Sequence, residues 1–307
     1  MNQRPLINLD RSISEIGLGC ASYWGNKRFS ERQAVAVVHA ALDHGITYFD
    51  TGHSYSGGYA EARLGRALAS SQVSRDGLLI SSKAGTRVGN YGRLCKDFSP
   101  EWLRRSCEQS LRDLGLGQLP VFYLHGPNPE DFNDDVFGLL ESLKAEGKIG
   151  LVGVNAFDDH IIKLTVESGQ FQCLMPDFNI LRPERIPQLA KWREQGFDVF
   201  VAGALAGGLY DQRFKQFRGL KSIWYWLRAW KNNRHQLRQA KTLAFLNNHP
   251  EHAATQLALA YVLQQPHFSS ALLGTTSVAH LTELAGVSAA DLGADWAQRI
   301  GEQQNTW

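Results

Sequence analysis

Two residues close together in the chain have the types needed for proton transfer. The stretch from Ile46 to Gly65 reads as a short buried strand ending at Asp50, then a polar, glycine-rich loop and a helix. Tyr55 lies in that loop, so a carboxylate that stays ionised and a phenol are expected to face one space. Catalytic side chains usually lie on loops that a rigid scaffold positions. The pairing therefore predicts proton transfer by the tyrosine.

Lys83 and His125 end two further apolar runs, as Asp50 ends its own. A tyrosine with an unperturbed pKa of about 10 is a weak acid near neutral pH, and a nearby ammonium lowers that pKa by favouring the phenolate. We expect Lys83 to supply this charge, and Asp50 to keep the lysine protonated in a partly desolvated pocket. His125 is then expected to orient the substrate oxygen or to share the proton.

These four residues need a scaffold that gathers strand ends, and the chain has eight apolar runs of strand length, each followed by a helix or by room for one. The expected strands are Ile13–Gly19, Thr47–Thr51, Leu78–Lys83, Val121–His125, Ile149–Asn155, Phe171–Phe178, Asp198–Leu205 and Ala271–Gly274. Apolar strands separated by helices are typical of a parallel sheet covered by helices. We predict an α/β fold: one (β/α)8 TIM barrel domain over residues 1–307, with a short N-terminal hairpin that starts at Pro5.

Local signals place the ends of several helices. Ser30 and Gln33 have the capping-box spacing, Ser99 and Pro100 form a cap with proline in the first turn, and Gly115 is a stop signal. An open doubly wound sheet is the alternative, and it would usually carry G-x-G-x-x-G after its first strand. Gly17-Leu18-Gly19 lacks the third glycine, so we favour the barrel, whose active sites lie at the C-terminal strand ends.

The amino-acid composition limits the kinds of molecule that the protein is expected to bind. The sequence holds 32 Lys and Arg against 30 Asp and Glu, and this balance predicts neither nucleic-acid nor membrane binding. The cysteines are scattered without a CxxC pair, and His53 has no second histidine two residues away, so no metal site is expected. No apolar run has the length of a signal peptide or a membrane span, which makes the cytoplasm the expected location.

Several motifs resemble those of the aldo-keto reductases in order and spacing, over roughly Ile13 to Gly286. They are Phe49-Asp50-Thr51 with Tyr55, Ser82-Lys83 before Gly85, Leu124-His125-Gly126-Pro127, Gly147-Lys148-Ile149, Gly153-Val154 and Gly274-Thr275-Thr276-Ser277. The resemblance implies a (β/α)8 barrel that uses NADPH or NADH. It also implies that Tyr55 is the general acid, that Lys83 and Asp50 tune it, and that His125 orients the carbonyl. In the reverse direction Tyr55 would act as the base.

The resemblance further implies where a cofactor would bind. Its phosphates need donors, which the backbone N–H groups of Gly207-Gly208-Leu209 and of the Gly274-Thr275-Thr276-Ser277 turn are expected to supply. Glu283 is expected near the adenine or ribose.

Four positions depart from the usual family pattern. Asn155-Ala156 replaces a Ser-Asn pair that holds the carboxamide, so Asn155 is expected to supply one hydrogen bond. Met175 replaces a glutamine, and Ala202 replaces the aromatic residue that stacks on nicotinamide. His280 replaces an arginine that contacts the 2′-phosphate, and a neutral imidazole binds phosphate less well than the arginine fork. On family frequency NADP(H) is the expected cofactor, with NAD(H) next.

Three tryptophans are expected to line a substrate pocket: Trp24 after the first strand, and Trp224 and Trp226 in a basic, aromatic segment over residues 210–241. The alternative for this segment is that Trp226 and Trp230, four residues apart, fasten a helix to the barrel.

The main functional hypothesis is an NAD(P)-dependent reductase or dehydrogenase acting on an aldehyde, a ketone or a sugar-like carbonyl compound, the substrate being a small molecule. The altered carboxamide and stacking positions favour the alternative of a non-catalytic nucleotide-binding redox sensor or partner subunit. Lyase or epimerase chemistry with Tyr55 as base and a retained cofactor is a third reading.

Overall fold

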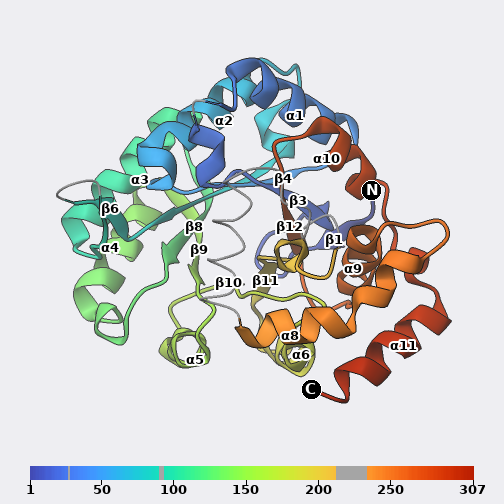
Figure 1. The fold of residues 1–307 in the computed structure, drawn as a ribbon. Helices are drawn as coiled ribbons and strands as arrows, with labels where there is room; N and C mark the ends of the chain where they lie inside the picture. Colours follow the sequence, from blue (N-terminus) through green and yellow to red (C-terminus); the bar gives the residue numbers. More distant parts are fainter. Residues whose placement is uncertain (27, 90–92, 212–233) are drawn as a thin grey trace.

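Eight parallel strands close into a barrel in the computed structural model, which describes residues 1–26, 28–89, 93–211 and 234–307 (Figure 1). In chain order they are β3 (Ile16–Gly19), β4 (Tyr48–Asp50), β5 (Leu79–Ala84), β8 (Leu119–His125), β9 (Ile149–Asn155), β10 (Cys173–Met175), β11 (Asp198–Val201) and β12 (Ser270–Gly274). Each pairs with the next, and β12 returns to β3 with Leu272 opposite Gly17. The predicted (β/α)8 fold is confirmed, and the open sheet is wrong.

Helices surround the strands (Figure 1). They are α1 (Glu31–Asp43), α2 (Tyr59–Ala69), α3 (Pro100–Leu114), α4 (Asp134–Ala145), α5 (Asp159–Ser168), α6 (Ile186–Glu194), α8 (Arg234–Thr242), α9 (Ala254–Leu263), α10 (Val278–Ala285) and α11 (Ala294–Gln304). The predicted capping box opens α1, since Ser30 accepts a hydrogen bond from the Gln33 N–H while the Gln33 side chain accepts one from the Ser30 N–H. Gly115 ends α3 in the left-handed conformation with φ 66°.

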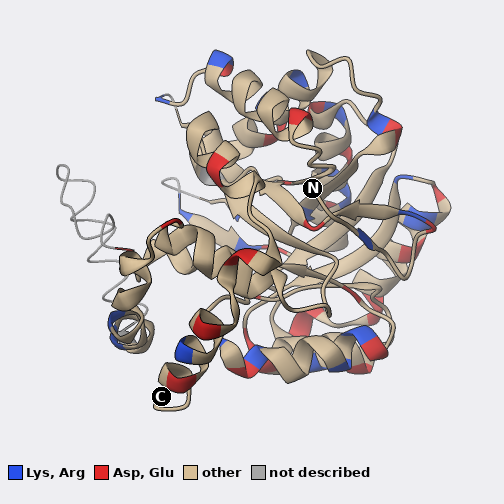
Figure 2. Cartoon of the chain, turned by 90° about the vertical axis from the view of Figure 1, so that its right-hand side faces the viewer, with Lys and Arg blue, Asp and Glu red and all other residues tan. Residues whose placement is uncertain are grey.

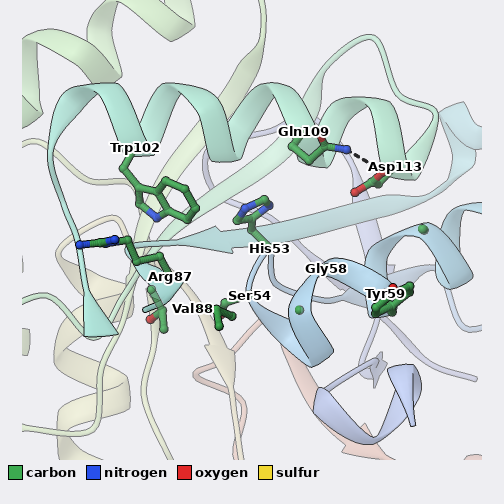
Figure 3. Close-up of a pocket in the computed structure, with 12 residues that line it drawn as sticks. His53, Ser54, Gly58, Tyr59, Arg87, Val88, Trp102, Gln109 and Asp113 are labelled. Atoms are coloured by element: carbon green, nitrogen blue, oxygen red, sulfur yellow. Dashed lines mark hydrogen bonds between the residues drawn. The ribbon is translucent and has the colours of Figure 1, made fainter. Parts of the chain in front are cut away.

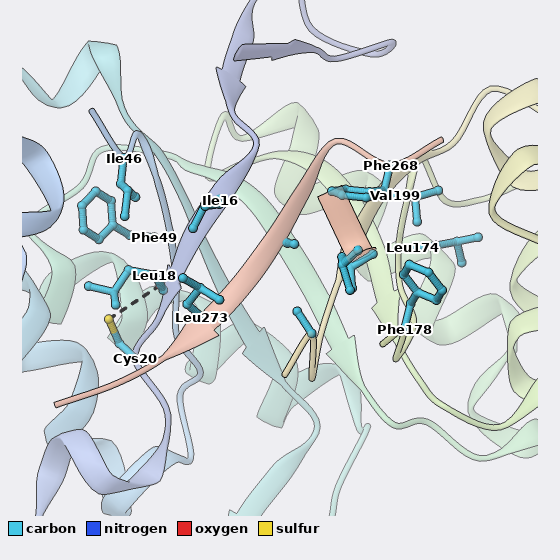
Figure 4. Close-up of a cluster of buried hydrophobic side chains, with 14 of the residues drawn as sticks. Ile16, Leu18, Cys20, Ile46, Phe49, Leu174, Phe178, Val199, Phe268 and Leu273 are labelled. Atoms are coloured by element: carbon cyan, nitrogen blue, oxygen red, sulfur yellow. Dashed lines mark hydrogen bonds between the residues drawn. The ribbon is translucent and has the colours of Figure 1, made fainter. Parts of the chain in front are cut away.

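The core has two layers because side chains along each strand alternate between the two faces of the sheet. Tyr48, Leu79 and Val121 belong to an inner cluster to which seven of the eight strands contribute, so it fills the barrel. Their neighbours Phe49, Ile80 and Phe122 belong to a larger cluster that includes helix side chains, part of which is drawn in Figure 4. The strands are therefore apolar on both faces, as the uninterrupted apolar runs indicated.

The N-terminal hairpin is present but shifted. Strand β1 (Gln3–Pro5) pairs antiparallel with β2 (Ser12–Ser14), and residues 6–11, which were expected to contain a strand, form the turn. Leu6 and Ile13 are buried in the inner cluster, so the hairpin covers the N-terminal end of the barrel.

A second hairpin, which the sequence did not predict, follows β5. Its strands β6 (Thr86–Val88) and β7 (Leu94–Lys96) pair antiparallel. Lys96 Nζ donates a hydrogen bond to the carbonyl oxygen of His125. The hairpin thus reaches the C-terminal end of β8.

Strands β10 and β11 are shorter than predicted. Pro176, which has no N–H to donate, follows β10, and beyond it only an isolated bridge joins Asp177 to Ala202. The backbone after β11 is thereby free to form the loop that borders the cavity described below.

Acidic and basic residues are interspersed along the helices in the view of Figure 2, as the balanced composition indicated. In the described part of the chain no helix is both long enough and apolar enough to cross a membrane.

Candidate active site

A cavity of about 590 Å³ lies where the C-terminal ends of the barrel strands meet. All four predicted catalytic residues line it, although they come from three strands and one loop. Other predicted site residues that line it are Asn155, Gly207, Gly274 and His280. The topology of the barrel therefore gathers residues that are far apart in the sequence.

Asp50 and Lys83 form a buried ion pair on neighbouring strands, β4 and β5. Lys83 Nζ donates to Asp50 Oδ2 and also to the carbonyl oxygen of Thr51, at 2.8 Å. Ser81 Oγ donates to the other carboxylate oxygen of Asp50 at 2.6 Å. Burial is the largest single influence and acts to lower the pKa of Lys83, but the charge and hydrogen bond of Asp50 together with Tyr55 and Cys20 outweigh it, and the pKa is raised. Lys83 is therefore an ammonium ion at neutral pH.

Tyr55 lies beside this ion pair, with Lys83 Nζ 5.4 Å from the centroid of its ring. Burial raises the pKa of Tyr55, while the charge of Lys83 lowers it by a smaller amount. The expectation that Lys83 makes the phenol more acidic than usual is thus wrong for the net effect, although Lys83 acts in the expected direction. Sequence spacing shows the neighbouring charge but not the depth of burial. The phenol stays protonated near neutral pH and is available as an acid.

His125 faces Tyr55 across the cavity. The two ring centroids are 5.6 Å apart and the rings are nearly perpendicular, at 89°. Burial, followed by the positive charges of Lys83 and Lys96, lowers the pKa of His125 to about 3. The imidazole is therefore neutral at physiological pH and can donate a hydrogen bond from one ring nitrogen.

Backbone strain marks the loops on two sides of the cavity. Ser56 (φ 54°) and Ala206 (φ 48°) are the non-glycine residues with positive φ in the described chain. Ser56 follows Tyr55, and Ala206 precedes the cavity-lining Gly207. Such conformations cost on the order of 1–3 kcal/mol and persist where the surroundings impose them, often at functional sites.

The residues present fit a nicotinamide dinucleotide. Asn155 Nδ2 donates to the carbonyl oxygen of Met175 at 2.8 Å, which leaves Oδ1 to accept from a ligand amide. Gly207 and Gly208 line the cavity with open space where a Cβ would stand, so their backbone can approach a ligand closely. Ser277 caps α10 by accepting from the His280 N–H at 3.3 Å, and His280 Nδ1 is 3.3 Å from Thr275 Oγ1.

Several residues that were predicted to contact the cofactor or the substrate do not line the cavity. Trp24 is fully buried, does not line the cavity and packs edge-on against Phe29 with 5.1 Å between the ring centroids. Its predicted substrate contact is therefore corrected to a core role. Leu209 is buried. The predicted cofactor-binding residues that do not line the cavity are Leu209, Thr275, Thr276, Ser277 and Glu283. Trp224 and Trp226 lie outside the described residues.

Two aromatic residues line the cavity without having been predicted. Tyr23, the neighbour of Trp24, donates from its hydroxyl to the carbonyl oxygen of Gly19 at 3.1 Å, and Phe157 is 53% exposed at the cavity. Both follow barrel strands closely in the chain. Their position just after a strand end is the signal that would have found them.

Comparison with known proteins gives consistent matches over the whole chain. The model of the aldo/keto reductase family matches residues 15–304. The uncharacterized oxidoreductase YqkF of Bacillus subtilis is 28% identical over 314 residues, covering 99% of this chain and 94% of that protein. D-threo-aldose 1-dehydrogenase of a Pseudomonas species is 26% identical over 324 residues, covering 94% and 93%.

Among solved structures, the holo form of aldo-keto reductase AKR11C1 from Bacillus halodurans superposes with a TM-score of 0.78 at 25% identity, covering 99% of this chain and 96% of that one. The barrel and the sequence matches thus indicate the same family.

Proposed function

This chain belongs to the aldo/keto reductase family, and from that premise we propose that it is an NAD(P)H-dependent oxidoreductase that reduces an aldehyde or ketone, or oxidises the corresponding alcohol. Tyr55 is the general acid in reduction and the general base in oxidation. The observation that carries the proposal is that Tyr55, His125 and the Lys83–Asp50 ion pair share one cavity.

When bound, a nicotinamide cofactor would supply the hydride that the carbonyl carbon accepts. The neutral imidazole of His125 donates a hydrogen bond to the carbonyl oxygen, and this contact orients the substrate toward Tyr55. As negative charge develops on that oxygen, Tyr55 transfers its proton to it, because an alkoxide is a far stronger base than a phenolate. Lys83 then stabilises the phenolate, and Asp50 with Ser81 keeps the lysine in place.

NADP(H) remains the first choice of cofactor on family frequency, with NAD(H) next. A sugar-like substrate is supported by the name of one relative, D-threo-aldose 1-dehydrogenase. Tyr55 and His125 supply hydrogen-bonding groups and Phe157 an apolar surface, which suits a small polar carbonyl compound.

The test is a fluorescence titration of the protein with NADPH and with NADH, followed by turnover assays with a panel of aldehydes, ketones and aldoses. Tyr55→Phe is expected to lower kcat about 10²–10⁴-fold, the usual contribution of a general acid, while nucleotide affinity changes little. Tyr59→Phe is the matched control, since Tyr59 is 70% exposed outside this cavity. Full turnover by Tyr55→Phe would rule out the proposed role.

A nucleotide-binding sensor is the second candidate, because Met175 and Ala202 line the cavity where the family usually has glutamine and an aromatic residue. Nucleotide binding without turnover of any carbonyl compound in the same assay would favour it.

A further inference from the structure

Strand β5 carries a second polar network on the face opposite the active site. Ser81 points into the barrel and donates to Asp50, whereas the next residue, Ser82, points outward and donates to Oε1 of Glu61. Ser110 of α3 donates to Oε2 of Glu61 at 3.0 Å. Glu61 lies in the first turn of α2, and its side chain has no exposed surface. A carboxylate buried in this way needs hydrogen bonds and a nearby positive charge.

His53 is the basic side chain beside this carboxylate. Its Nδ1 lies 3.7 Å from Glu61 Oε2, and within the described residues it is the only basic side chain recorded within ion-pair distance of Glu61. That separation is longer than a hydrogen bond, and Nδ1 is buried with no hydrogen-bond partner among the described residues. A small rotation of the ring would make the bond.

The backbone of His53 is also hydrogen-bonded to β5, the strand that carries Lys83. The His53 N–H donates to the carbonyl oxygen of Lys83 at 2.9 Å, and Tyr55 follows two residues later. The His53 ring packs edge-on against Trp102, with 5.6 Å between the ring centroids. Figure 3 shows the His53 ring beneath α3. The ring borders a second cavity of about 380 Å³, whose lining includes Arg87 and Asp113.

The loop that carries Tyr55 has backbone hydrogen bonds at Thr51, His53 and Tyr55, and after Tyr55 its backbone conformation becomes unusual. Ser56, Gly57 and Gly58 all have positive φ, at 54°, 66° and 92°. The loop follows Asp50, whose side chain forms its hydrogen bonds inside the barrel. It leads into α2, where the side chain of Glu61 forms its hydrogen bonds outside the barrel. Between Asp50 and Glu61, His53 is the side chain that faces the network of Ser82, Ser110 and Glu61.

We propose that His53 is a positioning residue, whose contact with Glu61 holds the loop from Thr51 to Gly58 so that the ring of Tyr55 stays beside Lys83. The proposal rests on the proposed function of Tyr55 as acid and base. The hydrogen-bond network of Ser82, Ser110 and Glu61 outside the barrel then affects the reaction only through the position of Tyr55. It has no contact with the substrate.

The first test measures Tyr55 without turnover. The charged or titratable groups around its ring are Lys83, Asp50 and His125, and of these Lys83 lowers the pKa of Tyr55. In His53→Ala the loop is expected to move out of the pocket, which removes the larger effect of burial together with the smaller effect of Lys83, so the phenol should titrate at lower pH than in wild type, closer to the ordinary tyrosine value of about 10. Tyrosinate absorbance of the nucleotide-free protein shows this, after subtraction of the same variant carrying Tyr55→Phe. A merely stabilising histidine would leave this titration unchanged.

The second test is kinetic. His53→Ala is expected to lower kcat about 10²-fold, as a displacement of a catalytic group by about 1 Å does, with little change in KM. His53→Asn keeps an N–H donor at the position of Nδ1, facing Glu61, and should retain most of the activity. His160→Ala, an exposed histidine on α5, is the matched control and should behave as wild type.

The second cavity allows a chemical rescue, because it borders His53. Added imidazole should restore part of the kcat of His53→Ala and return the Tyr55 titration to its wild-type position. Thiophene, a ring of similar size without an N–H group, should restore neither. Equal rescue by both rings would assign His53 to packing and overturn the proposal.

The results that would contradict the role of His53 differ from those that would contradict the proposed function. Should His53→Ala not fold, His53→Leu, which fills space without an N–H group, replaces it, and wild-type kcat and titration in that variant would overturn the proposal. If wild type turns over no carbonyl compound, the proposed function fails, while the Tyr55 titration still decides whether His53 positions the loop.

Discussion

At the scale of single residues, two opposing influences act on the phenol of Tyr55. Burial raises its pKa above 10, and Lys83 offsets only part of that rise. The proton is therefore held until the substrate oxygen becomes strongly basic. The ammonium contributes most after transfer, when it faces a phenolate.

The two directions of reaction should consequently differ in pH dependence. Reduction needs protonated Tyr55, so its kcat should stay level from about pH 6 to about pH 9, below the raised pKa. Oxidation needs the phenolate, so its kcat should rise with pH across the same range. Lys83→Met should move the rise in oxidation to higher pH. A bell-shaped reductive profile centred near neutral pH would contradict this assignment.

His125 should make the fold sensitive to acid. Its pKa is lowered from 6.5 to about 3, so between these pH values the unfolded chain binds a proton that the folded chain does not. The resulting contribution to the free energy of unfolding is fully present above pH 6.5 and is lost as the pH falls toward 3. At pH 4 the loss is about 3 kcal/mol. Urea unfolding at pH 7 and pH 4 should therefore show a smaller pH effect in His125→Gln than in wild type.

His280 is the residue through which cofactor preference can be tested. It lines the cavity at the first turn of α10, where the family often has an arginine. His280→Arg should favour NADPH over NADH by about tenfold, since a charge-assisted hydrogen bond contributes about 1.5–3 kcal/mol. Competitive fluorescence titrations measure the ratio, with His280→Gln as the uncharged control. An unchanged ratio would place the 2′-phosphate elsewhere.

At the scale of elements, the strand end that presents Lys83 depends on the turn after it. Gly85 has φ 105°, and a Cβ there would lie 2.1 Å from the ring of Phe98. Gly85→Ala should destabilise the fold by about 3 kcal/mol, because it combines an unfavourable backbone conformation with a clash in the core. Gly77→Ala, with nothing within 4 Å of its Cβ, is the control. Urea unfolding measures both, and equal values would contradict the argument.

Features set by neighbours in the chain were predictable. The capping box of α1, the Gly115 stop of α3 and the polar strand ends depend on local spacing, and the structure agrees. The β6–β7 hairpin was missed because its two short strands are largely exposed and carry no apolar run. Trp24 was misplaced because the path of a loop after a strand depends on what packs beside it, here Phe29.

At the scale of the whole molecule, the N-terminal hairpin is joined to the segment that precedes the last barrel strand. Arg4 donates to the carbonyl oxygens of Leu263 and Gln265 at 2.7 and 2.6 Å, and its guanidinium lies 4.0 Å from the ring centroid of Phe268. It also pairs with Glu15. The hairpin is thereby attached to the segment between α9 and β12.

Removing this attachment should weaken the whole fold. Arg4→Met removes the donor to three carbonyl groups, those of Leu263, Gln265 and Phe268, and the cation paired with Glu15, which should cost about 2–4 kcal/mol. Arg28→Met, at an exposed position, should change stability by less than about 0.5 kcal/mol. Denaturant unfolding of the two variants makes the comparison, and equal stabilities would show that the hairpin is dispensable.

The closure of the barrel by its last strand also bears on the order of events during synthesis. β3 pairs with β4 on one side and with β12 on the other, so the ring cannot close before residues 270–274 leave the ribosome. Until then β3 and β11 each present an open edge, which is a template for pairing with other chains. The nascent chain therefore carries two strand edges open to aggregation for most of its length, and the arrival of β12 ends that exposure.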